Sequence, residues 1–344
     1  GGISAQGFGV GLGGNVTISN TGSDLNVDLL ENINVNGSAL GRITFNAPGF
    51  DVLVQPSAGN VGSLTGFVDS TGNNITINPR LAGNTITVGN INANGDAIIR
   101  VDCALGAGSI VIPNASAPNS QVVATGSITL EAPTSITINE NPAITEVDAG
   151  NEVNIITDSL TNSGQVEANS NVNINACAPG NNLVVVNSGS ITSDADNSGG
   201  GDLRINNSNS GGEINVSGTG ILSATNNLNS ISVGTSGQRN SVNIQASQII
   251  GRVTGFGDGS SISVTTGDLR IGAWTDSGNV QFATSGIGAS LITTGTIDAS
   301  GSITANGGNV IFNDDASSTS TIEITSQPTG SVTLNDTADI SGTS

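Results

Sequence analysis

The sequence predicts an all-β fold, a single-stranded parallel β-helix (β-solenoid) with rungs of about 20 residues. Three observations predict it: a short apolar phrase recurs along the whole chain, β-branched residues dominate the phrase, and helical patterns are missing. The phrase is visible in GNVTIS at 14–19, GSITLE at 126–131, GDLRIG at 267–272 and GNVIFN at 308–313. Its period-two alternation indicates strands with one buried face.

Each recurrence of the phrase marks one expected strand. In the first half of the chain the strands are expected around Val16, Ile33, Ile43, Val52, Ile75, Ile86, Ile99, Ile110, Ile128, Ile136, Ile144, Val153 and Val172. In the second half they are expected around Val184, Leu203, Val242, Ile262, Val280, Ile303 and Ile322, with secondary strands at Ile214, Ile231, Leu269 and Val310. Steps of about 20 residues are typical of a solenoid.

The segments between strands carry corner residues. Runs such as NSG, SGG and NGG combine residues that tolerate left-handed backbone with residues that hydrogen-bond their own main chain. No segment keeps an apolar stripe at helical spacing, which argues against a doubly wound sheet with crossover helices. An antiparallel sandwich is the structural alternative, but it seldom repeats at one period over 344 residues. We expect a Gly-rich arm at 1–14 and a continuous solenoid over 15–344.

The composition limits the core and the partners. The chain has 49 Gly, 35% hydrophobic residues and only 2% aromatic residues, which fits a narrow core of small aliphatic side chains. The formal net charge is −20, and the seven basic residues are scattered Arg. Without clustered cations, nucleic acid is not an expected partner. No stretch reaches the roughly 18 apolar residues of a membrane span, so membrane insertion is not expected.

The repeated phrases resemble the repeat region of filamentous-haemagglutinin-like bacterial surface proteins. GNVTIS, GSITLEAPTSITIN, GDLRIN, GDLRIG and GGNVIFNDD carry this resemblance along nearly the whole chain. The resemblance implies a right-handed β-helix stalk of an exported adhesin. The family's secretion domain carries NPNG-type and NPNL-type motifs, whereas this chain has only NPR at 78–80 and NPA at 141–143. The chain begins at Gly1 without a signal peptide, so we expect a processed product or an excised segment.

The side chains available for catalysis are few. The chain has no His and no Tyr, and it also lacks Lys, so Asp, Glu and Cys are the remaining proton-transfer groups. The sequence therefore predicts no enzyme and no catalytic residues. Asp314 and Asp315 resemble the adjacent aspartates of pectin-type hydrolases, but a solvated acidic turn is the favoured interpretation. The alternative function is a carbohydrate-binding or carbohydrate-cleaving β-helix, in which Trp274 is the candidate for stacking on a sugar.

One acidic stretch suggests a cation site. DADNSGGGD at 194–202 places Asp194, Asp196 and Ser198 at alternate positions before Asp202, as at the start of an EF-hand-type calcium loop. The twelfth position is Ile205, so the closing bidentate carboxylate is missing. Calcium is therefore the one candidate cofactor, and a flexible acidic corner is the favoured interpretation.

The two cysteines are expected to be unpaired within the chain. At about 20 residues per rung and ~4.8 Å between rungs, Cys103 and Cys177 would lie about 18 Å apart along the axis. A disulfide needs Cα atoms within roughly 7 Å. We therefore expect two small buried core residues, or an intermolecular link.

The sequence thus predicts an extracellular structural protein. The hypothesis is a subunit of a self-assembling cell-surface filament or adhesin stalk, whose main partner is a further copy of the chain in a head-to-tail polymer. Host or matrix glycans are the second class of expected partner. Two alternatives are open for the arm at 1–14: a flexible arm, or an arm that orders by strand addition to a neighbour. On the second alternative, deleting residues 1–14 should abolish polymers.

Overall fold

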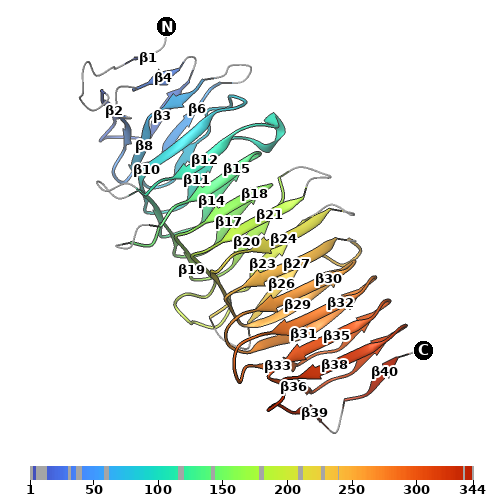
Figure 1. Ribbon diagram of the computed structural model, residues 1–344. Helices are drawn as coiled ribbons and strands as arrows, with labels where there is room; N and C mark the ends of the chain where they lie inside the picture. The colour runs from blue at the N-terminus through green and yellow to red at the C-terminus, as the bar shows by residue number, and fades with distance from the viewer. Residues whose placement is uncertain are drawn as a thin grey trace. The chain divides into compact units, whose positions relative to one another are not determined.

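The computed structural model describes two compact units, which are treated separately. The described residues are 3–4, 14–29, 32–35, 41–57, 62–114, 120–140, 144–177, 182–207, 212–225, 229–238, 240–335 and 338–342. Unit 1 is Gly1–Asn169 and unit 2 is Ser170–Ser344. In both units the strands stack in parallel, as Figure 1 shows.

Unit 1 consists of three ladders of parallel strands. The first ladder begins with residues 85–87 of β10 (Thr85–Ala93) and contains β12 (Ser109–Ile112), β15 (Ser135–Ile138) and β18 (Ser159–Asn162). The second contains β3 (Leu25–Asp28), β6 (Val52–Gln55), β9 (Ile75–Ile77), β11 (Ala97–Arg100), β14 (Ile128–Ala132) and β17 (Val153–Thr157). The third contains β2 (Val16–Ser19), β5 (Arg42–Asn46) and β8 (Phe67–Gly72), and continues through residues 90–93 of β10 to β13 (Gln121–Ala124), β16 (Val147–Ala149) and β19 (Gln165–Ala168). A separate three-stranded sheet contains β1 (Ile3–Ser4), β4 (Ile33–Asn34) and β7 (Leu64–Thr65). One 3-10 turn, η1, covers Cys103–Leu105.

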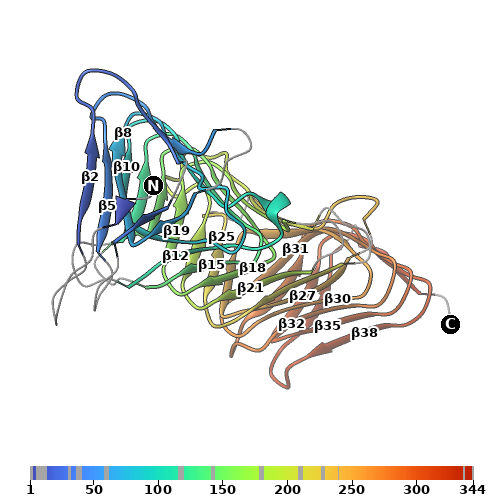
Figure 2. The ribbon, with the colours of Figure 1, turned by 90° about the horizontal axis from the view of Figure 1, so that it is seen from above.

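Unit 2 has the same plan. Its first ladder contains β21 (Leu183–Asn187), β24 (Glu213–Ser217), β27 (Ser241–Ala246), β30 (Ser260–Val264), β32 (Val280–Thr284), β35 (Ile303–Gly307) and β38 (Ile322–Ser326). The second contains β20 (Val172–Asn175), β23 (Leu203–Asn206), β26 (Ser230–Val233), β29 (Arg252–Gly257), β31 (Leu269–Asp276), β33 (Ser290–Thr293), β36 (Asn309–Phe312) and β39 (Val332–Leu334). The third contains β22 (Ser190–Thr192), β25 (Ile221–Ser223) and β28 (Gln248–Ile250). A further column, β34 (Ile297–Ala299), β37 (Ala316–Ser318) and β40 (Ile340–Gly342), pairs with the C-terminal part of β31. Figure 2 shows β27, β30, β32, β35 and β38 side by side.

The predicted parallel β-helix is confirmed, with strands that alternate between two long parallel sheets. The alternation in the sequence becomes alternation in burial: in β12 the side chains of Ile110 and Ile112 are fully buried. Stacked rungs place like residues over one another, so Ile110 pairs with Ile136, and Ile136 with Leu160. Each unit therefore has a core made of aliphatic columns, which explains the low aromatic content.

Polar side chains at the corners connect one rung to the next. In unit 1 the Asp24 carboxylate accepts a hydrogen bond from the Asp51 N–H at 3.1 Å, and Asp51 accepts one from the Asn74 N–H at 3.0 Å. The column continues from Asn74 to the Asp96 N–H at 3.0 Å, and from Asp96 to the Ser127 N–H at 2.7 Å. We call such a column a corner ladder. It satisfies the backbone N–H that enters each strand, a group that the sheet alone leaves unpaired.

Unit 2 repeats the corner ladder, always with Asn or Asp at the strand entrance. The contacts join Asn171 to the Asp202 N–H at 3.0 Å, Asp202 to the Ser230 N–H at 3.1 Å, and Asp268 to the Ser290 N–H at 2.8 Å. The preceding glycine is needed for close approach: a Cβ at Gly201 would lie 2.2 Å from the Ser170 carbonyl oxygen. The recurring Gly-Asp-Leu and Gly-Asn-Val phrases therefore encode a corner followed by a strand.

Two features of the rungs differ from the expectation. Ile144 does not lie in a strand, because the nearest following strand, β16, begins only at Val147. The rung length also varies: Val242 pairs with Ser260, 18 residues later, whereas Leu183 pairs with Ile214, 31 residues later. Corners of variable length absorb the difference without disturbing the register of the strands.

The predicted division into an arm and a solenoid remains a prediction. Of the expected arm at 1–14, only Ile3, Ser4 and Gly14 belong to the described residues, and the rest lies outside them. Ile3 and Ser4 form β1, which pairs in parallel with β4.

The corner ladder makes a prediction about stability. Asp96→Ala removes the acceptor of the Ser127 N–H and is expected to lower the free energy of unfolding of unit 1 by about 0.5–1.5 kcal/mol. Asp96→Asn keeps an acceptor in the same place and is the matched control. Denaturant unfolding of the full chain measures both, and equal effects of the two substitutions would contradict the ladder.

A second prediction concerns pH. Glu167 pairs with Asp148 of the neighbouring rung, and burial, followed by the Asp148 charge, raises the pKa of Glu167 above its usual 4.5. Because the folded-state pKa is raised, the ionised carboxylate destabilises the fold above that pKa, and the penalty vanishes below 4.5. Glu167→Gln is therefore expected to stabilise unit 1 at pH 7 by roughly 0.2–1 kcal/mol.

The same unfolding experiment, repeated down to pH 3.5, checks the direction of this effect. The advantage of Glu167→Gln should shrink as the pH falls. Glu140→Gln, which changes an exposed carboxylate of unit 1, is the control and should have little effect. An advantage that does not change with pH would exclude the electrostatic cause.

Candidate functional site

The corner at 194–202 is the predicted calcium site. Asp194 is fully buried, and its backbone φ is 53°. Its carboxylate accepts hydrogen bonds from the Gly199 N–H at 3.0 Å and from the Asn229 amide at 2.8 Å. The Asp194 carboxylate therefore stabilises the corner by accepting hydrogen bonds from the Gly199 backbone and the Asn229 side chain.

The other predicted ligands have separate partners. Asp196 is exposed, and its carboxylate accepts from the Ser198 N–H at 3.1 Å. Asp202 belongs to the corner ladder and also accepts from the Arg204 guanidinium at 3.2 Å. Within the described part of the chain, no three His, Cys, Asp or Glu side chains gather closely enough to hold a metal ion. Calcium at Asp194, Asp196, Ser198 and Asp202 stays a prediction without geometric support.

Trp274 does not lie on the surface, so the expectation that it stacks on a sugar is wrong. The side chain is 1% exposed, and its ring contacts Phe282 edge to face at 6.0 Å between centroids. The indole N–H donates to Asp276 at 3.3 Å. This buried carboxylate also accepts from the Gly259 N–H at 2.8 Å and the Gly278 N–H at 2.7 Å. The register between β29 and β31 shifts between Val253 and Gly255, and this irregularity changes the alternation of β31 so that Trp274 faces the core.

The adjacent aspartates form a corner. Asp314 accepts hydrogen bonds from the Asp315 N–H at 2.9 Å and from the Thr296 hydroxyl at 3.5 Å. Asp315 accepts from the Asp339 N–H at 2.8 Å, in the manner of the corner ladder. This geometry matches the interpretation as an acidic turn.

Arginines on the outer surface are paired locally. Arg204 lies 3.2 Å from Asp202, and Arg270 lies 3.6 Å from Asp268, in each case two residues earlier on the same strand entrance. In unit 1, Arg42 pairs with the buried Asp69 of the next rung and lies over the Phe67 ring at 5.5 Å. These pairs neutralise the guanidinium groups where they stand.

The cysteine expectation is also wrong. Both Cys103 and Cys177 are disulfide-bonded, and the described chain contains no free cysteine. The argument from rung spacing fails because neither residue lies in a strand or in the core. Cys103 opens the 3-10 turn after β11, Cys177 follows β20, and both are partly exposed. The distance between two residues in corner segments does not follow from the number of rungs between them.

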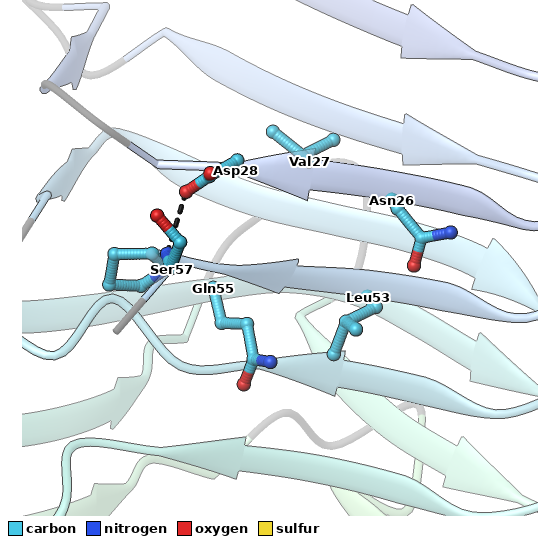
Figure 3. A pocket seen from close by; sticks show the side chains of 7 residues that line it. Asn26, Val27, Asp28, Leu53, Gln55 and Ser57 are labelled. Carbon is cyan, nitrogen blue, oxygen red and sulfur yellow. Dashed lines mark hydrogen bonds between the residues drawn. The ribbon is translucent and has the colours of Figure 1, made fainter. Parts of the chain in front are cut away.

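The surface of the described residues has hollows that no sequence motif indicates, one of which, of 160 Å³, lies beside Gln238 and Phe256. In unit 1 a cavity of 190 Å³ lies on the outer surface of β3 and β6, where Asn26, Leu53 and Gln55 line it (Figure 3). Figure 3 also shows the hydrogen bond from the Ser57 N–H to Asp28, at 2.7 Å. This cavity is smaller than the usual small-molecule site of about 300–1,000 Å³.

A larger hollow is a groove of 460 Å³ in unit 2. It crosses four successive strands of the first ladder at their C-terminal ends and is lined by 263–265, 283–285, 306–307 and 325–328. Its residues belong to four separate phrases and include outward-facing positions such as Ser263, Ala283 and Asn306 beside buried ones such as Val264 and Thr284. Only the stacking of the rungs brings them together, so no local motif could have revealed the groove.

No family model matches the chain, and no curated protein or solved structure matches it either. Among the described residues, no helix has the length and apolar character needed to cross a membrane. The structure thus establishes a parallel β-solenoid-like repeat architecture, and the function has to be argued from the surfaces of this chain.

The disulfide leads to a third prediction. Removing one cysteine, as in Cys103→Ser, is expected to lower the free energy of unfolding by about 2–4 kcal/mol, because the crosslink restricts the unfolded chain. Thiol titration of the denatured, unreduced wild-type protein should find no free thiol. Two titratable thiols per chain, or a Cys103→Ser variant as stable as the wild type, would contradict the crosslink.

Proposed function

We propose that this chain is an extracellular structural protein, a subunit of a cell-surface filament or adhesin stalk in which β-solenoids stack end to end. The repeated phrases that resemble filamentous-haemagglutinin-like proteins support this proposal. The role is mechanical, without catalysis, and the main partner is a second copy of the chain.

The observation that carries the proposal is the state of the last described rung. Val332 and Leu334 of β39 occupy inward-facing positions, yet they are 47% and 52% exposed. One rung earlier, the equivalent Val310 and Phe312 of β36 are fully buried. Within the described residues β39 pairs with β36 alone. The apolar surface of Val332 and Leu334 is therefore open to a further rung, and we propose that a second copy supplies it, because an unpaired strand edge accepts further strands.

In the proposed filament the first strands of a second copy pair with this open edge. A head-to-tail contact that does not close into a ring produces a filament.

The disulfide supports the extracellular assignment. Disulfides persist in oxidising environments and are rare in reducing ones, and both cysteines of this chain are bonded. The net charge of −20 suits a protein that must stay dispersed before it assembles.

Assembly is tested by sedimentation velocity and negatively stained electron microscopy of the full chain over a range of concentrations, with and without calcium. We expect concentration-dependent polymers. Leu334→Asp should weaken association at least about tenfold, because a buried leucine contributes about 1.5–3 kcal/mol.

Ile287→Asp is the matched control, since Ile287 is 102% exposed in a corner of the same unit and away from the last rung. It should leave assembly unchanged. A wild-type chain that stays monomeric at every concentration would refute the proposal. Equal loss of association in both variants would instead indicate non-specific hydrophobic contact.

A further inference from the structure

We infer that the 460 Å³ groove of unit 2 is a binding site for an uncharged oligosaccharide. This inference is independent of end-to-end assembly, because the groove lies on the outer surface of β30, β32, β35 and β38. Its volume falls within the range of about 300–1,000 Å³ that is typical of ligand sites.

The groove exists because one corner is short. β35 ends at Gly307 and β36 begins at Asn309, so only Gly308 separates them. The corners on either side are longer: 285–289 follows β32, and 327–331 follows β38. A Cβ at Gly308 would lie 2.4 Å from the Ala289 carbonyl oxygen, so this corner cannot carry a side chain that fills the space.

A column of outward-facing residues forms the floor. Ser263, Ala283, Asn306 and Thr325 follow one another in register over four rungs. Because the Ala283 side chain is a single methyl group, the floor is deepest at this residue. Its neighbours in the column carry polar side chains. Asn306 and Thr325 are one rung apart, and Ser263 and Asn306 are two rungs apart. One rung spacing of ~4.8 Å is comparable to the length of one pyranose ring.

The lining presents hydrogen-bonding groups that the protein itself does not use. The hydroxyls of Thr265, Thr284 and Ser285 donate to backbone carbonyls. The side chains of Ser263, Asn306, Thr325 and Gln327, in contrast, have no hydrogen-bond partner within the described chain. These four supply donors and acceptors to a ligand that has many hydroxyl groups.

The charge of the groove selects the ligand class. No lining residue carries a charge, although the chain has a net charge of −20. An ionic ligand would lose hydration without meeting an opposite charge, which is unfavourable. Ala283 and Pro328 add apolar surface against which the C–H face of a sugar can pack. An uncharged molecule with apolar faces and many hydroxyls is a neutral oligosaccharide.

The test is isothermal titration calorimetry of the full chain. Cellohexaose and mannohexaose are the uncharged probes, and trigalacturonate is the anionic one. We expect saturable binding of an uncharged probe and none of trigalacturonate. Asn306→Ala removes an amide from the floor, and Ala283→Leu fills the low centre without removing a polar group. Each should weaken binding at least tenfold.

Thr304→Ala is the matched control, because Thr304 faces outward on the same strand but does not line the groove. It should bind like the wild type. The inference is overturned if neither uncharged probe binds, if trigalacturonate binds as tightly, or if Asn306→Ala and Ala283→Leu both behave like Thr304→Ala. Circular dichroism of each variant establishes that it is folded.

Discussion

The stacking of rungs depends on one interaction, the hydrogen bond from a corner Asn or Asp to the backbone N–H at the entrance of the next strand. In a parallel stack this N–H stands just outside the sheet, where no strand partner reaches it. The column from Asp24 through Asp51 and Asn74 to Asp96 supplies a side-chain acceptor at each step. Each acceptor also fixes the height of one rung on the next, and with it the register of the buried columns.

The register between successive rungs determines which side chains of each strand face the core. Because the side-chain period of a strand is two, a slip by one residue would turn every buried aliphatic side chain outward. Columns such as Ile110, Ile136 and Leu160 therefore depend on the corners that precede them. The same logic explains the buried carboxylates: Asp194 and Asp276 satisfy backbone N–H groups at corners, where a metal or a catalytic role would need them free.

A protein built in this way offers two kinds of functional surface. A rung with a neighbour on one side only exposes inward-facing side chains, as Val332 and Leu334 show within the described residues. The side of a stack places outward residues in columns, and a short corner beside a longer one leaves a hollow over them. The first kind suits assembly and the second suits recognition of a ligand with a repeating structure. A filament that displays binding grooves along its sides would combine both.

The sequence by itself determined the parallel β-helix, because alternation and periodicity are local properties that each phrase carries. Nearly every expected strand is present, and the exception at Ile144 lies where the corner runs on to Val147. Only the tertiary structure decided the burial of Trp274, the bonded state of the cysteines and the groove. Burial of Trp274 follows from a register shift between β29 and β31, a relation between two rungs. The groove likewise joins outward residues of four rungs, and both cysteines lie in corners whose paths no strand spacing fixes. Such relations depend on how distant segments pack against one another, so no single repeat of the sequence determines them.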